Sequence, residues 1–257
     1  MPELLKMYLI VCPLIFLGGF VDSMAGGGGL ITLPAYLMAG VPVHFAAGTN
    51  KVVNGCGAAM AGFRYFRSGK VRLRPALCAA AGAIVGGYFG AEFAKNLSEN
   101  LLQGLMLIAL PLVALFLVLK KDFGQEAETE KTYSRRYEIG VSLAIGLVMG
   151  CYDGIVGPGT GTFLLMAFSA LLGMDMVTAS GCSRVGNLAS NAAAATSFIL
   201  GGKIMWALVV PGALCSILGN NCGVRFALRG GGKKIRGMIF VVLGMLFIKM
   251  LADLVTK

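Results

Sequence analysis

The feature that most constrains this chain is a series of long apolar runs that contain almost no charged residues. A helix needs about 20 mainly apolar residues to cross the hydrocarbon core of a bilayer. Runs near this length, some of them only with flanking residues, lie at 7–21, 76–91, 101–119, 139–152, 204–219 and 238–251. They do not alternate apolar and polar residues, as the strands of a membrane β-barrel would. The sequence therefore predicts an all-α integral membrane protein.

The charged residues support this prediction and disfavour other classes of protein. Only 13% of the 257 residues are charged, against roughly a quarter in a soluble domain. The net charge of +10 comes from Lys and Arg at the ends of the apolar runs, which is typical of residues that orient a membrane protein. No basic helix with interleaved aromatic residues is present, so we expect no nucleic-acid partner.

The cysteine and histidine content gives no sign of a metal site, a cofactor or catalysis. The seven cysteines form no C-x-x-C pair, and there is one histidine, so we read the cysteines as small buried residues. No Ser-His-Asp or Cys-His set is evident. We therefore predict no catalytic residues, no metal ligands and no cofactor.

The sequence contains an internal duplication. Aligned with itself at an offset of about 133 residues, the segment 48–90 matches 181–223, and a glycine-rich segment upstream pairs Asp22 with Asp153. One structural unit is therefore repeated. We place the first membrane repeat at 1–119, a cytoplasmic polar linker at 120–137 and the second membrane repeat at 138–257.

The basic residues predict that the two repeats have opposite orientations. In the first half they crowd the loop at 64–74, whereas in the second half they lie one loop later, at 225–236. Because cytoplasmic loops carry an excess of Lys and Arg, this shift by one crossing indicates an inverted repeat. We expect roughly 8–10 transmembrane segments, including glycine-rich segments that are broken or re-entrant.

Two glycine-rich breaks, at 26–29 and 157–161, occupy equivalent places in the halves. Irregular backbone at membrane depth is tolerated only where it is buried in protein or lines a cavity. Free backbone N–H groups and the positive end of a helix dipole form an anion site there. The alternative is that the glycines only allow close packing, as we expect for Gly82, Gly86 and Gly90. The candidate binding residues in the breaks are Gly27, Gly28, Gly159 and Thr160.

The strongest local signal is a polar motif that occurs once in each half. It reads Gly48-Thr49-Asn50-Lys51-x-x-Asn54 in the first half and Gly181-Cys182-Ser183-Arg184-x-x-Asn187 in the second. Each copy places a cation and an amide three residues apart on one helical face. An ionisable residue inside the membrane is a functional candidate by default, although a long basic side chain can also extend to the interface. We favour an anion site formed by Lys51, Arg184, Thr49, Asn50, Asn54, Ser183 and Asn187.

Asp22 and Asp153 are the second matched pair of ionisable residues. In an apolar helix a carboxylate either pairs with a cation such as Lys51 or Arg184, or stays protonated. The first state is structural and the second couples transport to a proton, and the residues leave both open.

These residues together resemble the TauE/SafE family of membrane permeases, also called sulfite exporters. The resemblance covers nearly the whole chain through GFVDSMAGGGGLITLPAYLMAGVP, AAGTNKVVNG and FRSGKV, followed by YDGIVGPGTGTF, VGNLASN and LGGKI. It implies transport of sulfite, sulfonates or related anions across a bacterial inner membrane without ATP. A Thr-Lys pair is typical where this chain has Ser183 and Arg184. Since Arg binds oxyanions through a planar fork, the resemblance does not fix the substrate.

We therefore expect a multi-pass secondary transporter of the inner membrane that moves a small, sulfur-containing anion by rocking one half against the other. The bilayer and the anion are the expected partners, while a homo-oligomer and coupling to a proton or another ion are left open. The alternatives are a membrane-embedded enzyme acting on a lipid or sulfur substrate, and an anion channel.

Overall fold

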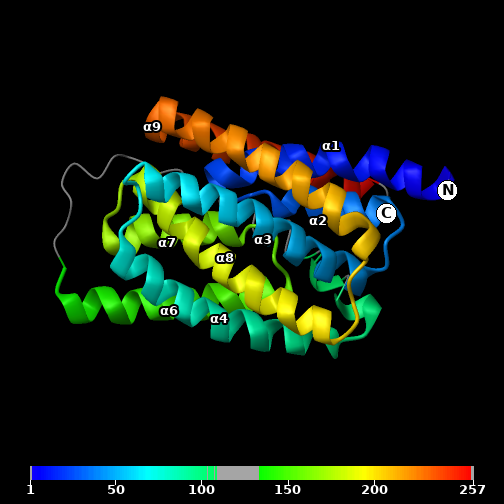
Figure 1. The fold of residues 1–257 in the computed structure, drawn as a ribbon, viewed down its shortest axis with the longest axis horizontal. Helices are drawn as coiled ribbons and strands as arrows, with labels where there is room; N and C mark the ends of the chain where they lie inside the picture. Colours follow the sequence, from blue (N-terminus) through cyan, green and yellow to red (C-terminus); the bar gives the residue numbers. More distant parts are fainter. Residues whose placement is uncertain (1, 103, 107, 109–132, 256–257) are drawn as a thin grey trace.

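The computed structural model describes residues 2–102, 104–106, 108 and 133–255, and within these ranges the side chains are described from residue 4 to residue 230. Every regular element in this part of the chain is a helix (Figure 1), which confirms the predicted all-α membrane fold. The first half contains α1 (Pro2–Ala25), α2 (Gly29–Met38), α3 (Val43–Arg67) and α4 (Leu73–Lys95), and the second half contains α6 (Arg135–Ile155), α7 (Thr160–Leu172), α8 (Met176–Leu200) and α9 (Trp206–Val255). Most of the predicted linker at 120–137 and the end of the run at 101–119 lie outside the described residues.

The long apolar helices match the apolar runs of the sequence. Within the described residues, four segments are long and apolar enough to cross a membrane, namely Leu4–Ala25, Leu73–Lys95, Arg135–Ile155 and Trp206–Gly230. α3 and α8 each have 25 residues but are richer in small and polar side chains. α2 and α7 have 10 and 13 residues, which is too short to cross a bilayer. The two breaks therefore divide each repeat into long and short helices.

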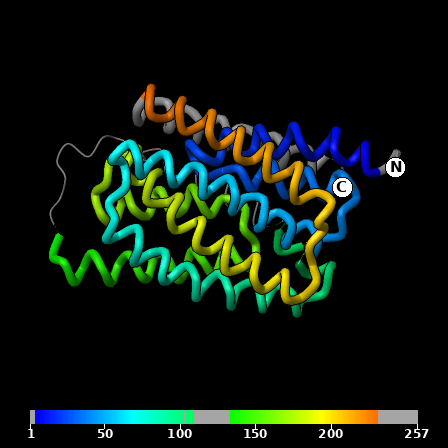
Figure 2. Tube along the Cα trace, viewed as in Figure 1, coloured from blue at the N-terminus to red at the C-terminus, as the bar shows by residue number. Residues whose placement is uncertain are grey.

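The helices form three layers (Figures 1 and 2). α1 and α9 pack together on one face, α4 and α6 pack together on the opposite face, and α3 and α8 lie between them. Glycines bring α4 and α6 into backbone contact, because a Cβ on Gly86 would lie 2.2 Å from the Leu147 carbonyl oxygen. A Cβ on Gly219 of α9 would lie 2.1 Å from the Phe16 oxygen of α1. The predicted packing role of the glycines in α4 is thus seen directly.

The long helices of the first half run opposite to their counterparts in the second half. α1, α3 and the first part of α9 run in one direction along the long axis, while α6, α8 and α4 run in the other (Figure 1). The helix contacts follow the same repeat relation. α1 packs on α9, and its counterpart α6 packs on α4, which is the counterpart of α9. This is the relation that inverted repeats require, and their inversion across a bilayer stays a prediction.

The loop predicted at 225–236 is replaced by helix. α9 continues through this segment, so Arg225 and Arg229 lie on a helix instead of in a loop. Basic side chains favour helix well and can reach water from a helix end, so the charge cluster does not need a loop.

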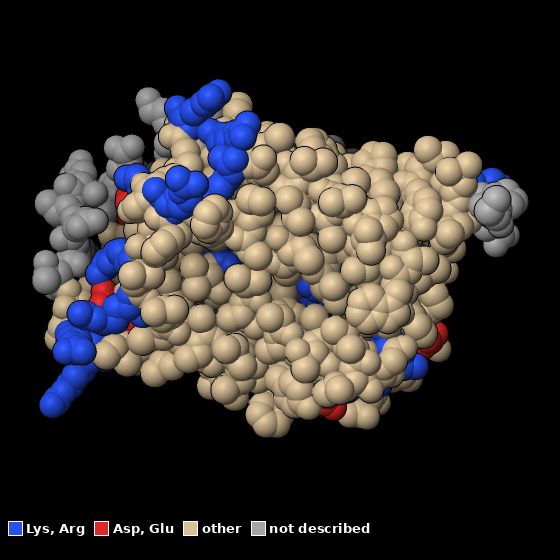
Figure 3. All heavy atoms as spheres, in the orientation of Figure 1, with Lys and Arg blue, Asp and Glu red and all other residues tan. Residues whose placement is uncertain are grey.

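The charged side chains are concentrated at the ends of the molecule (Figure 3). Lys and Arg gather at the end where α3 ends and α6 begins, while the middle of the visible face is almost free of charge. Large apolar side chains such as Leu9, Phe89 and Val210 are more than 60% exposed on α1, α4 and α9. An apolar belt between charged ends is what a bilayer requires of the surface it covers.

Candidate functional site

Two glycine-rich breaks meet at the centre of the protein. α1 ends at Ala25 and α2 begins at Gly29, while α6 ends at Ile155 and α7 begins at Thr160. Gly26 has a φ of 81°, a conformation that favours glycine. A Cβ on Gly26 would also lie 2.0 Å from the carbonyl carbon of Gly161 in the other break. The two breaks therefore cross in direct backbone contact, and a side chain at Gly26 would separate them.

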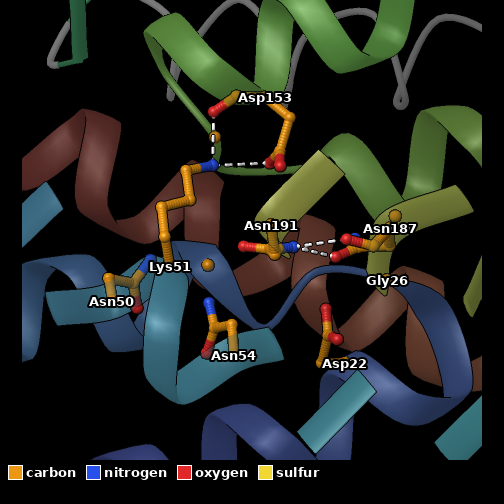
Figure 4. A pocket seen from close by; sticks show the side chains of 11 residues that line it. Asp22, Gly26, Asn50, Lys51, Asn54, Asp153, Asn187 and Asn191 are labelled. Carbon is orange, nitrogen blue, oxygen red and sulfur yellow. Dashed lines mark hydrogen bonds and ion pairs between the residues drawn. The ribbon is translucent and has the colours of Figure 1, made fainter. Parts of the chain in front are cut away.

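A polar pocket lies beside this crossing (Figure 4). The space open to the centre of a water-sized sphere is about 10 Å³, which is room for about one water molecule. Both repeats and both breaks contribute to its walls. The lining residues are Asp22, Gly26, Gly29, Asn50, Lys51, Asn54, Asp153, Gly157, Gly161, Asn187 and Asn191.

Two buried ion pairs join the halves at this pocket. Nζ of Lys51 lies 2.8 Å from Oδ1 of Asp153 (Figure 4), and Nη1 of Arg184 lies 2.6 Å from Oδ2 of Asp22. Lys51 is 4% exposed and Arg184 is 0% exposed. Each aspartate therefore neutralises the cation of the opposite repeat, and the four side chains together carry no net charge.

Each carboxylate oxygen has one donor. The second oxygen of Asp22 accepts the backbone N–H of Gly28 at 3.0 Å, and the second oxygen of Asp153 accepts the hydroxyl of Ser190 at 2.8 Å. Nζ of Lys51 also donates to the Asp153 carbonyl oxygen. Because a buried carboxylate is stable only when it is paired and hydrogen-bonded, this pattern fits two ionised aspartates.

The surroundings of the pocket also supply a positive electrostatic potential and one hydrogen-bond donor that no described residue uses. α2 and α7 both begin at the pocket wall, so the positive ends of two helix dipoles point toward it. The guanidinium of Arg184 lies behind Gly161, where an added Cβ would be 2.4 Å from Nη2. Nε of Arg184 is buried, and no hydrogen-bond partner for it exists among the described residues. The site thus offers more donor capacity than its own carboxylates use.

The structure brings some of the sequence-predicted residues to the pocket and places others outside it. Asp22, Asn50, Lys51, Asn54, Asp153 and Asn187 line it. The other predicted residues, Thr49, Ser183, Arg184, Gly27, Gly28, Gly159 and Thr160, are not in the lining.

Several of the residues outside the lining have structural partners. The hydroxyl of Thr49 accepts the backbone N–H of Met205 at 2.9 Å, at the start of α9. The hydroxyl of Ser183 donates to the Ser180 carbonyl oxygen and accepts from Arg184. The hydroxyl of Thr160 donates to the Gly157 carbonyl oxygen. These contacts hold the backbone or the arginine in place, and no ligand is needed to explain them.

Asn191 lines the pocket and was missed by the sequence analysis. Its amide nitrogen donates to the carbonyl oxygen of Asn187 at 2.8 Å and to the side-chain oxygen of the same residue (Figure 4). The four-residue spacing from Asn187 on one helical face was a usable signal. Comparison of the two repeats did not point to Asn191, because the equivalent residue in the first half is Ala58.

The described residues contain no group of three or more His, Cys, Asp or Glu side chains that could hold a metal ion. The chemistry available at the pocket is therefore that of cations, carboxylates, amides and backbone N–H groups.

Comparison with known proteins decides the family. The model of the family described as Sulfite exporter TauE/SafE matches residues 11–250. The chain belongs to this family. A protein of Sinorhizobium sp, named Probable membrane transporter protein ORF9, is 34% identical over 93% of this chain and 90% of its own length. A Probable membrane transporter protein of Haemophilus influenzae is 31% identical over 93% of this chain and 92% of its own length. The Escherichia coli protein named Probable membrane transporter protein YfcA is 34% identical, covering 92% of this chain and 87% of its own.

No solved structure matches the chain. The family, the apolar helices and the named relatives make this TauE/SafE protein a membrane transporter.

Proposed function

We propose that this transporter carries a small sulfur-containing oxyanion, such as sulfite or an organosulfonate, across the bacterial inner membrane as a secondary transporter. The observation that carries the proposal is the pair of buried cations, Lys51 and Arg184, beside the crossing of the two glycine breaks. The proposal also takes the substrate class from the description of the family.

The donor set of the site fits an oxyanion. Lys51 supplies a compact charge and Arg184 a planar fork, and amides of Asn50, Asn54 and Asn187 or Asn191 supply neutral donors. Backbone N–H groups at the start of α2 and α7 add to this set. An oxyanion competes with Asp22 and Asp153 for the same donors, because carboxylates and sulfur oxyanions both accept hydrogen bonds through negatively charged oxygen atoms.

Alternating access needs two bodies that move relative to each other, and the packing indicates that these are not the two sequence halves. α1 and α3 pack with α9 from the second half, and α2 packs on α1 and α3. α6 and α8 pack with α4 from the first half, and α7 packs on α6 and α8. We call these groups the α1–α9 bundle and the α4–α6 bundle. The glycine contacts between α4 and α6 and between α1 and α9 lie within the bundles, so rocking one sequence half against the other would separate both of these interfaces. The contact of Gly26 with Gly161 lies between the bundles.

Both ion pairs bridge the two bundles. Asp22 and Lys51 belong to the α1–α9 bundle, and Arg184 and Asp153 belong to the α4–α6 bundle. An anion that replaces a carboxylate at either cation therefore changes the contact between the bundles. We propose that this exchange links substrate binding to the movement.

Sulfite flux into proteoliposomes tests the proposal, with sulfate, thiosulfate and taurine as competitors. We expect saturable flux in the wild type and at least tenfold lower flux in Lys51→Ala and Arg184→Ala, with folding checked by size-exclusion chromatography in detergent. Lys70→Ala is the matched control, because it removes an exposed surface cation and should transport normally.

The other outcomes separate the alternative functions. Normal flux in folded Lys51→Ala would refute the assignment of the site. Flux that does not saturate would indicate a channel, and turnover of a lipid or sulfur compound by the purified protein would indicate an enzyme.

A further inference from the structure

We infer that Asp153 is an exchangeable counter-ion that takes up a proton when the anion binds Lys51, so that one proton crosses with each monovalent anion. This inference rests on the proposed function and adds a coupling ion and a stoichiometry to it. It also gives the two ion pairs different roles, although they are equivalent in the repeat.

The two ion pairs differ in their access to the pocket. Lys51 and Asp153 both line it, and the Lys51 ammonium is held on a flexible stem between the two walls (Figure 4). The Arg184 guanidinium is fully buried behind Gly161 and is not part of the lining, although its partner Asp22 is. An anion entering the pocket thus meets Lys51 first, and the pair of Arg184 with Asp22 is the fixed one.

Anion binding at Lys51 leaves the Asp153 carboxylate without its cation. Asp153 is 3% exposed, and its remaining side-chain donor is the hydroxyl of Ser190. A buried carboxylate that loses its cation and gains an anion as a neighbour binds a proton more tightly, because burial and like charge both disfavour its ionised form. By linkage, a bound proton on Asp153 then favours anion binding at Lys51 to the same extent.

The charge balance sets the stoichiometry. With the pocket empty, Lys51, Arg184, Asp22 and Asp153 carry no net charge. With a monovalent anion bound and Asp153 protonated, the two cations balance Asp22 and the anion, so the site is again neutral. Neither form therefore moves net charge through the low-dielectric interior, where an uncompensated charge is costly.

The groups that face the exchange site come from several elements. They are Asp22 from α1, Lys51 and Tyr65 from α3, Tyr152 and Asp153 from α6, and Arg184 from α8. α2 and α7 contain no charged side chain. The hydroxyl of Tyr152 donates to the Pro158 carbonyl oxygen and that of Tyr65 to the Ser23 carbonyl oxygen, so the tyrosines are already engaged. The aspartates remain as proton acceptors, and Asp153 is the one whose cation faces the pocket.

The experiment uses labelled methanesulfonate in proteoliposomes, because this monovalent sulfonate carries no titrating group near neutral pH. Exchange of internal for external methanesulfonate at equal pH reports the carrier alone, and net accumulation under a pH gradient reports the coupling. For one proton per anion, a tenfold proton gradient drives up to tenfold accumulation, and an imposed membrane potential leaves that accumulation unchanged. If the wild type exchanges methanesulfonate but does not accumulate it under the pH gradient, the inference is overturned and the proposed function stands. If the wild type shows no exchange at equal pH, the result counts against both.

Two variants locate the proton. Asp153→Asn should retain measurable exchange, lose accumulation under the pH gradient and gain sensitivity to membrane potential. Glu92→Gln alters a carboxylate that pairs with Lys95 away from the pocket and should keep both activities. Accumulation that persists in Asp153→Asn but is lost in Asp22→Asn would assign the proton to the other pair and overturn the inference.

A measurement on the wild type keeps the inference testable if Asp153→Asn does not fold. Methanesulfonate added to the detergent-solubilised protein in weak buffer should cause uptake of one proton per bound anion, followed with a pH indicator. Binding without proton uptake would overturn the inference.

Discussion

Arg184 is the least exposed charged residue among the described side chains, and its partner Asp22 is 9% exposed. Removing one member of a buried pair costs about 3–5 kcal/mol, whereas removing both costs far less, because no uncompensated charge remains. We therefore expect Arg184→Ala to lower the thermal unfolding midpoint in detergent much more than the double variant Arg184→Ala, Asp22→Asn. Equal midpoints in the two variants would show that Asp22 does not depend on Arg184 for its stability.

The same pair shows what the residues alone could and could not predict. The repeat aligned Asp22 with Asp153 and Lys51 with Arg184, and all four side chains are buried in the ion pairs at the pocket. The crosswise pairing was not predictable, because it depends on how the two repeats dock. Small polar residues were harder still, since a hydroxyl such as that of Thr49 satisfies a backbone group as easily as a ligand.

The close packing of α4 on α6 depends on glycine. A Cβ on Gly86 would lie 2.2 Å from the Leu147 oxygen and 2.6 Å from the Cys151 nitrogen, and backbone atoms cannot move aside as a side chain can. We expect Gly86→Leu to separate these helices and reduce both the unfolding midpoint and the transport rate. The size of the effect should match overpacking of a well-packed core, about 1–3 kcal/mol or more.

Gly140→Ala is the control for this prediction. Gly140 lies in α6, the helix on which Gly86 of α4 packs, but an added Cβ there meets nothing within 4 Å. Alanine favours helix over glycine, so this variant should be as stable as the wild type or slightly more stable. A Gly86→Leu protein with a wild-type midpoint would contradict the packing argument.

The helices were predictable where a periodic or uniform pattern determines them. Within the described residues, the apolar runs and the glycine breaks both correspond to observed elements, because membrane length and glycine conformation act locally. The loop at 225–236 was predicted wrongly from charge alone, since charge places a segment near water without fixing its backbone. The grouping of the helices into the α1–α9 bundle and the α4–α6 bundle was also not predictable, because α4 and α9 each pack with the opposite half.

At the scale of the whole molecule, the equivalent helix ends lie on opposite sides. Ser68 follows α3 and Gly201 follows α8 at the same position of the repeat, and these two helix ends are at opposite ends of the long axis (Figure 1). The end beside Ser68 carries the gathered Lys and Arg side chains (Figure 3). Since such residues favour the cytoplasm, this end should face inward and the Gly201 end outward.

Cysteine labelling tests this orientation and the inversion together. In a chain whose seven native cysteines are replaced, Ser68→Cys and Gly201→Cys each place one thiol at an exposed turn. The Cβ at Gly201 meets Cδ of Lys95 at 2.9 Å, and this flexible side chain can move. An impermeant maleimide added to intact cells should label Gly201→Cys and leave Ser68→Cys unreacted, and inside-out vesicles should give the reverse. Labelling of both positions from one side would contradict the inverted repeat, because the equivalent ends of two inverted units must lie across the membrane from each other.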